Sequence, residues 1–345
     1  MLPLCFKKGH LSSKDGEGQD AIVNGSGKLV LKGLPMQNRL TKILGIQFPL
    51  ILGPMRMITL GAMAAAVSNS GGLGQIASST LPVMQLRDEI KKAKDLTDRP
   101  FGINIPLHWP NALDVLDIAM ETDVRVITTS GGNPARIMNQ AKAGGIQVLH
   151  KVSTVEMSLK AQGAGVSGVI GMGFEGGGHG GRSQVTTLCL IPRLTDVLDI
   201  PVIAAGGIMD YRGFLAALAL GAEGVEIGTR FLTSPECNIP RYYKDAVLDS
   251  SETGTVVVGD GTMTLRIIKN SAAKFFGNRN REKSDGHRIV DYISGEADSA
   301  SAIMPAGQGA GLTKTIQPIP EIMAEFIDRS RDLSVKMRQL MEDKG

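Results

Sequence analysis

The sequence predicts an α/β protein built as a closed (β/α)8 barrel, with a small, mostly helical insertion after the eighth strand. From Met36 onward, apolar runs of four to six residues alternate with amphipathic stretches of ten or more, which is the pattern of strands joined by helices. The number of strand-like runs reaches eight and then stops. An open, doubly wound sheet is the alternative, but the chain does not open on the Gly-x-Gly-x-x-Gly sequence typical of that fold.

Each predicted strand is a short apolar run, and each predicted helix is a longer amphipathic stretch between two runs. The eight predicted strands are Phe48–Leu52, Gln75–Ser78, Phe101–Ile105, Val124–Thr128, Gln147–Lys151, Gly168–Met172, Pro201–Ala205 and Gly224–Ile227. The predicted helices are Leu60–Asn69, Pro82–Ala93, Ala112–Glu121, Pro134–Ala143, Thr154–Gly163, Leu190–Leu198 and Tyr211–Leu220. Several end beside glycine, as at Gly71, Gly145 and Gly221, which favours a left-handed C-terminal cap.

The chain divides into four parts. Residues 1–35 are glycine-rich and lack periodicity, which predicts a disordered or non-native extension, with a short hairpin around Ile22–Leu34 as the alternative. Residues 36–231 form the predicted barrel. Residues 232–312 carry more charge and are predicted to form a helical cap or insertion that ends in an apolar glycine loop. Residues 313–345 contain an amphipathic helix, about Ile319–Met341, expected to pack on the barrel.

The composition excludes several classes of protein. A net charge of +3 and a single tryptophan among 345 residues give no basic or aromatic surface for nucleic acid. The three cysteines, Cys5, Cys189 and Cys237, are far apart and have no metal-ligand spacing, which indicates a reducing compartment and no metal site. No apolar run reaches the ~18 residues of a membrane span, and the apolar start is too short for a signal peptide. We therefore expect a cytoplasmic protein.

The loops after the seventh and eighth strands predict a phosphate site. Gly206 and Gly207 follow the seventh strand, and Gly228 and Thr229 follow the eighth. In a (β/α)8 barrel these two loops are neighbours and usually bind phosphate. Their backbone N–H groups and the Thr229 hydroxyl are suitable donors.

Three other predicted strand ends also carry residues that suit a ring-shaped ligand. Gly53, Pro54 and Met55 form a sharp turn after the first strand, with a soft side chain for a flat aromatic ring. Asn104 and Lys151 end apolar strands, where an unpaired polar group is costly. They could contact the edge of a flavin or another polar ring, or Lys151 could form a Schiff base.

The segment Gly173–Gly181 follows the sixth predicted strand and contains six glycines and one histidine, His179. Glycine lets the backbone approach a ligand closely, and histidine exchanges protons near neutral pH. Glu175 could orient His179 or cap the next turn. His150 is expected to be packed rather than catalytic, because its side chain points to the opposite face of its strand from Lys151.

Together these segments resemble the nitronate monooxygenase family, formerly called 2-nitropropane dioxygenases, which are FMN-dependent TIM-barrel enzymes related to FMN-dependent enoyl-acyl-carrier-protein reductases and quinone reductases. The resemblance extends from about Asn38 to the C-terminal helix. The matching segments are Gly53–Met55, Ala64–Gly74, Arg99–Asn104, Gly173–Gly181, Ala205–Gly207, Gly228–Leu232 and Ala306–Leu312. The tracts Phe231–Ile239 and Arg266–Asn270 are more similar to the nitronate branch.

The resemblance implies that FMN binds at the mouth of the barrel, with its phosphate on the two loops described above. It places the isoalloxazine ring near Pro54, Met55, Asn104, Lys151, Gly177 and Gly178, and His179 in the active site. The implied reaction is oxidation of an alkyl nitronate by O2 to a carbonyl compound and nitrite. The alternative is an NAD(P)H-dependent reductase of enoyl thioesters or quinones. The expected partners are a nitronate or nitroalkane, O2 and a second copy of the chain.

Three positions depart from the pattern of many relatives. Arg56-Met57-Ile58 stands where an aromatic residue is common, Met172 stands where an acidic residue is common, and Pro305 replaces a serine. These differences bear on the substrate more than on the cofactor.

Overall fold

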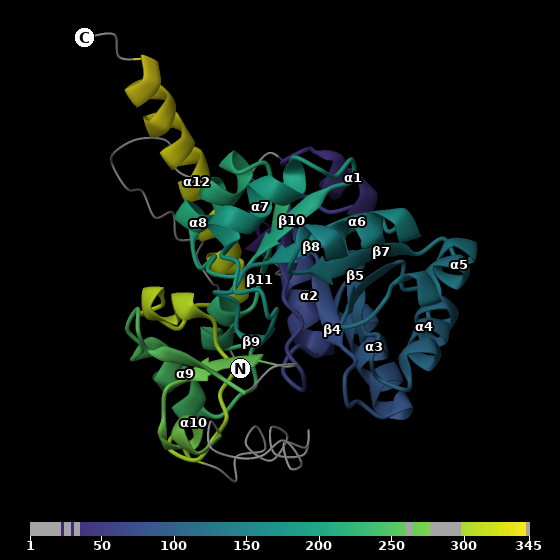
Figure 1. The fold of residues 1–345 in the computed structure, drawn as a ribbon, viewed down its shortest axis with the longest axis horizontal. Coiled ribbons are helices and arrows are strands. Elements are labelled where there is room, and N and C mark those ends of the chain that lie inside the picture. The colour runs from purple at the N-terminus through teal and green to yellow at the C-terminus, as the bar shows by residue number, and fades with distance from the viewer. Residues whose placement is uncertain (1–21, 24–28, 31–34, 260–263, 277–297, 343–345) are drawn as a thin grey trace, which may run out of the picture.

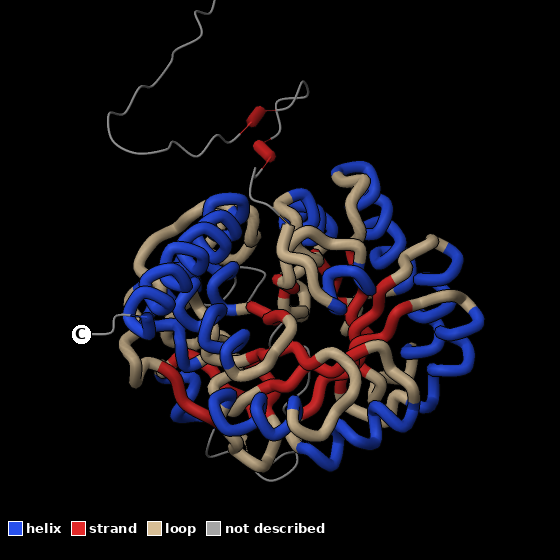
Figure 2. Tube along the Cα trace, turned by 90° about the horizontal axis from the view of Figure 1, so that it is seen from above, coloured by secondary structure: helices blue, strands red, loops and turns tan. Residues whose placement is uncertain are grey.

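The structure is a computed structural model that describes residues 22–23, 29–30, 35–259, 264–276 and 298–342. Eight parallel strands form one sheet, in the order β3-β11-β10-β8-β7-β6-β5-β4. A parallel bridge between Ile51 of β3 and Leu73, the residue before β4, closes the barrel. Figures 1 and 2 show the arrangement of the strands and helices. The strands are β3 (Leu50–Leu52), β4 (Gly74–Ala77), β5 (Phe101–Pro106), β6 (Val126–Ser130), β7 (Gln147–Val152), β8 (Gly168–Met172), β10 (Val202–Ala205) and β11 (Gly224–Ile227). The predicted barrel is therefore confirmed.

Helices between consecutive strands form an outer ring around the barrel (Figure 2). They are α2 (Gly61–Asn69), α3 (Val83–Leu96), α4 (Ala112–Glu121), α5 (Ala135–Ala143), α6 (Val155–Ala164), α7 (Thr187–Thr195) and α8 (Tyr211–Ala219). Gly71, Gly145 and Gly221, expected at helix ends, have φ of +87°, +66° and +95°. α7 begins three residues earlier than the sequence predicts, because the Glu175 carboxylate accepts hydrogen bonds from the Thr187 backbone N–H.

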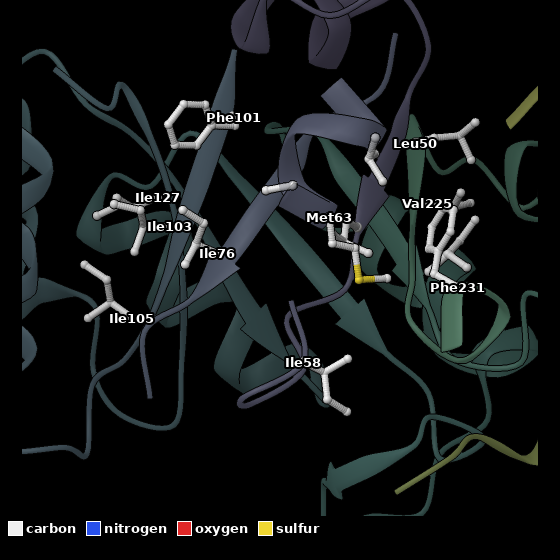
Figure 3. Packing of buried hydrophobic residues seen from close by; sticks show 14 of the residues in the cluster. Leu50, Ile58, Met63, Ile76, Phe101, Ile103, Ile105, Ile127, Val225 and Phe231 are labelled. Carbon is white, nitrogen blue, oxygen red and sulfur yellow. The ribbon is translucent and has the colours of Figure 1, made fainter. Parts of the chain in front are cut away.

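Two apolar clusters hold the barrel together. One lies between the strands and the helices and includes Ile76, Ile103 and Ile127 (Figure 3). The other fills the barrel interior, where side chains from β3, β6, β7, β8 and β10 meet Leu73, directly before β4, and Leu40 and Leu44 of the short helix α1 (Arg39–Leu44). Burying each such side chain contributes roughly 1.5–3 kcal/mol. The chain before the first strand therefore completes the interior core.

The segment after β11 is not helical throughout. It contains the 3-10 helix η1 (Thr229–Thr233), α9 (Arg241–Leu248), β12 (Thr255–Val258), β13 (Thr264–Ile268), α10 (Ser271–Phe276) and η3 (Gln308–Leu312). β12 and β13 form an antiparallel sheet with β9 (Gly178–Gly180) of the barrel loop (Figure 1). The prediction of a helical cap missed this strand pair, because the strands are short and one of their partners lies about 85 residues earlier in the chain.

The C-terminal helix α12 (Ile319–Glu342) packs against α8 and α2. Phe326 meets Phe214 of α8 edge to face, with ring centroids 6.4 Å apart. Arg230, the residue after Thr229, is buried. Its guanidinium donates a hydrogen bond to the side-chain oxygen of Gln317 and lies 3.9 Å from the carboxylate of Glu325 in α12. Arg230 therefore connects the barrel rim to the C-terminal helix.

Most of residues 1–35 lie outside the described residues. The two described pairs, β1 (Ile22–Val23) and β2 (Leu29–Val30), are antiparallel partners, as the hairpin alternative requires. No helix in the described ranges is long and apolar enough to cross a membrane.

His150 of β7 is buried on the outer side of the barrel, with 3% of its surface exposed. Its Nδ1 lies 2.7 Å from the hydroxyl oxygen of Thr129. Burial lowers the pKa of His150 from 6.5 to about 4, since the interior disfavours an imidazolium ion. The residue is packed, as the sequence predicts.

We expect His150 to make the protein less stable in acid. The unfolded chain binds a proton near pH 6.5 and the folded chain only near pH 4, so stability falls as pH falls through this window. The loss reaches about 3 kcal/mol by pH 4. Urea unfolding of His150→Gln, compared with the parent at pH 7 and pH 4.5, checks this. The variant should lose less stability on acidification, and an identical loss in both proteins would contradict the assignment.

Candidate active site

The two predicted phosphate loops lie side by side. β10 and β11 pair in parallel, with Ala205 beside Glu226, so Gly206–Gly207 and Gly228–Thr229 leave the barrel as neighbours. Gly206 and Gly207 have φ of +95° and +75°, conformations that other residues adopt at a cost. The Thr229 hydroxyl accepts a hydrogen bond from the Gly307 N–H at 2.8 Å, which leaves the hydroxyl hydrogen able to donate.

The turn after β3 lies against the same loops. The Gly53 N–H donates to the Ile227 carbonyl at 2.7 Å, and a Cβ on Gly53 would lie 3.2 Å from the Gly228 nitrogen. The Met55 sulfur would lie 3.6 Å from a Cβ on Gly228. Pro54 joins these two residues. The predicted first-strand turn and the predicted phosphate loops therefore meet at one side of the rim.

The glycine-rich segment packs against the second glycine loop. A Cβ on Gly177 would lie 2.5 Å from the Gly307 nitrogen and 2.6 Å from the Ala306 carbonyl carbon, so only glycine fits there. Gly178 has a φ of +74°, and a Cβ there would meet no atom of the described residues within 4 Å. Gly177 is thus fixed by packing, while Gly178 faces open space.

His179 is carried by a strand rather than by a flexible loop. It lies in β9 and pairs with Leu265 of β13. Arg266 of β13 donates to the Phe174 carbonyl at 3.1 and 3.2 Å, and its guanidinium lies 4.7 Å from the centre of the Phe174 ring. Arg266 therefore holds the segment that presents His179. This link was not found from the sequence because its two partners are 92 residues apart.

Glu175 does not orient His179. Both of its carboxylate oxygens accept the Thr187 N–H, at 2.9 and 3.1 Å, and the Thr187 hydroxyl donates to one of them. Of the two roles that the sequence left open, the structure therefore shows the cap. A carboxylate at a helix N-terminus is favoured by the helix dipole.

The surroundings of His179 are basic. The pKa of His179 is lowered, first by the protein packed around the ring, and then by the positive charges of Arg56 and His108. The residue keeps an exposed surface, and an exposed side chain retains much of its hydration. Burial and the neighbouring Arg56 charge both act in the direction that favours the neutral imidazole of His179 at pH 7.

Asn104 and Lys151 belong to a buried polar network that the sequence predicted only in part. The Lys151 Nζ lies 2.5 Å from the Oε2 of Glu226, whose side chain is almost fully buried. The Asn104 amide donates to Thr128 at 3.0 Å, and Gln75 connects Thr128 to Glu226. Gln75, Thr128 and Glu226 were missed. For Gln75 and Thr128 the available signal was a polar residue two positions after an apolar residue of the interior, Leu73 and Val126, whereas Glu226 follows Gly224 and has no such signal.

The ion pair with Glu226 disfavours the Schiff-base alternative for Lys151. A Schiff-base lysine needs its amine free to attack a carbonyl carbon, whereas the Lys151 Nζ lies 2.5 Å from the Glu226 carboxylate. Within the described ranges, no group of three or more His, Cys, Asp or Glu side chains is placed to hold a metal ion.

Two of the departing positions have packing roles. Met172 fills the space that a Cβ on Gly176 would occupy, with its Cε 2.3 Å from that point. The Pro305 carbonyl accepts the Tyr243 hydroxyl at 2.5 Å, and Tyr243 is buried. Met172 therefore packs against the glycine-rich segment, and Tyr243 holds Pro305, the residue directly before the second glycine loop.

The family model described as "Nitronate monooxygenase" matches residues 37–328. A "Probable nitronate monooxygenase" of Staphylococcus aureus (strain Newman) is 34% identical over 265 residues, which cover 64% of this chain and 75% of the relative. A Rhodococcus jostii (strain RHA1) protein, "(3aS,4S,5R,7aS)-5-hydroxy-7a-methyl-1-oxo-octahydro-1H-indene-4-carboxyl-CoA dehydrogenase", is 37% identical over 222 residues, covering 64% of this chain and 62% of that protein.

Among solved structures, FabK from Thermotoga maritima superimposes with a TM-score of 0.83 at 34% identity, covering 88% of this chain and 99% of FabK. The similarity includes both the barrel and the segment that follows it. The resemblance found in the sequence is thus confirmed, and this oxidoreductase belongs to the nitronate monooxygenase family.

Proposed function

We propose that this chain binds FMN at the C-terminal rim of the barrel and oxidises alkyl nitronates with O2 to carbonyl compounds and nitrite. The observation that carries the proposal is His179, a neutral imidazole with an exposed surface, held on β9 beside the glycine loops of the rim. The family model and the Staphylococcus aureus relative support the reaction class.

The rim residues fit the cofactor. Gly206, Gly207, Gly228 and Thr229 offer backbone N–H groups and one hydroxyl for the phosphate. Glycine conformations with positive φ at Gly206 and Gly207 let the backbone approach a ligand closely. Pro54, Met55, Asn104, Lys151, Gly177 and Gly178 are the residues that would surround the ring. When bound, FMN supplies a two-electron acceptor that also reacts with O2.

His179 would act on the substrate in one of two ways. As a neutral base it can accept the proton from the carbon next to the nitro group of a neutral nitroalkane, which leaves the anionic nitronate. With an anionic nitronate as substrate, it can donate its N–H to a nitronate oxygen. The charge of Arg56 favours the anion in both cases.

Anaerobic mixing tests the proposal. The FMN-loaded protein is mixed with propionate-3-nitronate, NADH or NADPH, and the absorbance of the oxidised flavin is followed. We expect the nitronate to bleach the flavin rapidly, and nitrite to form when O2 is admitted. Rapid bleaching by NAD(P)H alone would contradict the proposal. Absence of a yellow chromophore after reconstitution with FMN would remove every flavin-dependent function.

The second candidate is an NAD(P)H-dependent reductase of enoyl thioesters or quinones. The similarity to FabK and to a carboxyl-CoA dehydrogenase favours a thioester substrate. This candidate predicts bleaching by NAD(P)H, followed by reoxidation with crotonyl-CoA or a quinone in the absence of O2. The same apparatus therefore distinguishes the two functions.

A further inference from the structure

The polar network in the barrel occupies one defined layer. Leu73, directly before β4, Val126 of β6 and Leu149 of β7 belong to the interior core, and the residues two positions later are Gln75, Thr128 and Lys151. Side chains two apart on a strand share one face, so these polar groups lie one layer closer to the mouth. Glu226 joins them from β11. The layer thus separates the apolar interior from the proposed cofactor site.

The polar side chains of this layer form one connected series of hydrogen bonds, in which each donor faces an acceptor. The Asn104 amide donates to Thr128, and the Thr128 hydroxyl donates to the side-chain oxygen (Oε1) of Gln75 at 2.5 Å. The Gln75 amide donates to Glu226 Oε1 at 3.2 Å and to the Leu52 carbonyl. Lys151 donates to the other carboxylate oxygen. Both oxygens of Glu226 therefore accept bonds.

The ion pair of Lys151 and Glu226 is exposed on one side only. The side chain of Glu226 is 3% exposed and that of Lys151 is 19% exposed, so the pair is open to solvent on the Lys151 side. A buried ion pair is weak evidence for stability, because desolvation offsets the attraction between the charges. Barrel interiors are usually filled by branched apolar residues. The ion pair of Lys151 and Glu226 is therefore better explained by a role at the mouth of the barrel than by a contribution to stability.

We propose that Glu226 is a positioning residue for the cofactor site, which fixes the Lys151 ammonium at the rim and compensates its charge, and thereby lowers the reduction potential of the bound flavin. The inference rests on the proposed binding of FMN. A lone cation beside the ring would favour the reduced, more negative cofactor. With Glu226 at 2.5 Å from Lys151, the pair carries no net charge, and most of this effect is cancelled.

Midpoint potentials of the FMN-loaded variants, measured spectroelectrochemically, test the proposal. Glu226→Gln keeps the size of the side chain and removes its charge. We expect its potential to be more positive than the parent's, by at least tenfold in the reduction equilibrium, which is about 30 mV for two electrons. Lys151→Met should shift the potential to more negative values or leave it unchanged. The double variant should return to within about threefold of the parent's equilibrium constant.

Each single variant tests the sign of the effect independently, so the test survives if one of them does not fold. A negative or absent shift in Glu226→Gln, or a positive shift in Lys151→Met, overturns the proposal. A purely structural role for the pair would lower the unfolding midpoint of both variants without opposite shifts in potential. If the parent binds no flavin, the proposed function fails. If it binds flavin and the signs are wrong, only this inference fails.

Discussion

Replacing His179 with alanine is expected to leave flavin binding intact and to lower kcat/KM for a neutral nitroalkane by about 10²–10⁴-fold. The ring has an exposed surface, so its loss leaves no buried polar group unpaired. What is lost is the base that removes the substrate proton. Steady-state oxygen consumption, with the flavin content measured from the visible spectrum, checks both parts of the prediction.

The preformed nitronate is the internal control, because it has already lost the proton. If His179 acts as the base, the alanine variant should turn over the nitronate much better than the nitroalkane, relative to the parent. An equal loss with both substrates would indicate that His179 binds the nitronate oxygens instead. Unchanged turnover of both would remove His179 from the mechanism.

The pH dependence follows from the lowered pKa of His179. A base whose pKa lies below the usual 6.5 stays unprotonated at neutral pH and loses activity only as pH falls below that value. For the nitroalkane, kcat/KM of the parent should therefore be flat near pH 7 and decline in more acidic solution. This decline should be absent from the residual activity of the alanine variant.

Gly177→Ala is expected to weaken FMN binding at least tenfold and to lower the free energy of unfolding by about 1–3 kcal/mol, the usual cost of overpacking. The new Cβ would lie 2.5 Å from the Gly307 nitrogen and 2.6 Å from the Ala306 carbonyl carbon. Both are backbone atoms, so no side-chain rotation relieves the clash, and one glycine loop must move away from the other. Flavin titration followed by fluorescence, together with urea unfolding, measures the two effects.

Gly163→Ala is the matched control. Gly163 lies in helix α6, and a Cβ there would meet nothing in the described residues within 4 Å. Alanine also has a higher helix propensity than glycine, so this variant should be at least as stable as the parent and bind FMN equally well. Equal behaviour of the two variants would show that Gly177 is not packed as the structure indicates.

Local patterns predicted the barrel well because each strand and helix has its own signal. The apolar runs marked all eight strands, and glycine marked several helix ends, as at Gly71 and Gly221. Local signals were weaker where an element depends on a distant partner. α7 begins at Thr187 only because Glu175 caps it from 12 residues away, and β13 is a strand only beside β9 and β12.

The residues of the candidate site also divide into those with a local signal in the sequence and those that depend on distant partners. The residues at strand ends could be predicted, because a parallel barrel brings all its C-terminal strand ends to one rim. Glu226 could not be assigned in this way. It lies within an apolar strand, and its partners Lys151 and Gln75 come from strands 75 and 151 residues away in the sequence.

The sequence by itself therefore determined the barrel, the family and the set of glycines and strand ends that form the rim, since these depend on period, local conformation and strand order. The tertiary structure alone decided how the rim is held. It placed Gly177 against Gly307, Arg266 over Phe174, and Glu226 against Lys151. These are contacts between atoms far apart in the chain, and such contacts form only when the packed barrel brings the segments together.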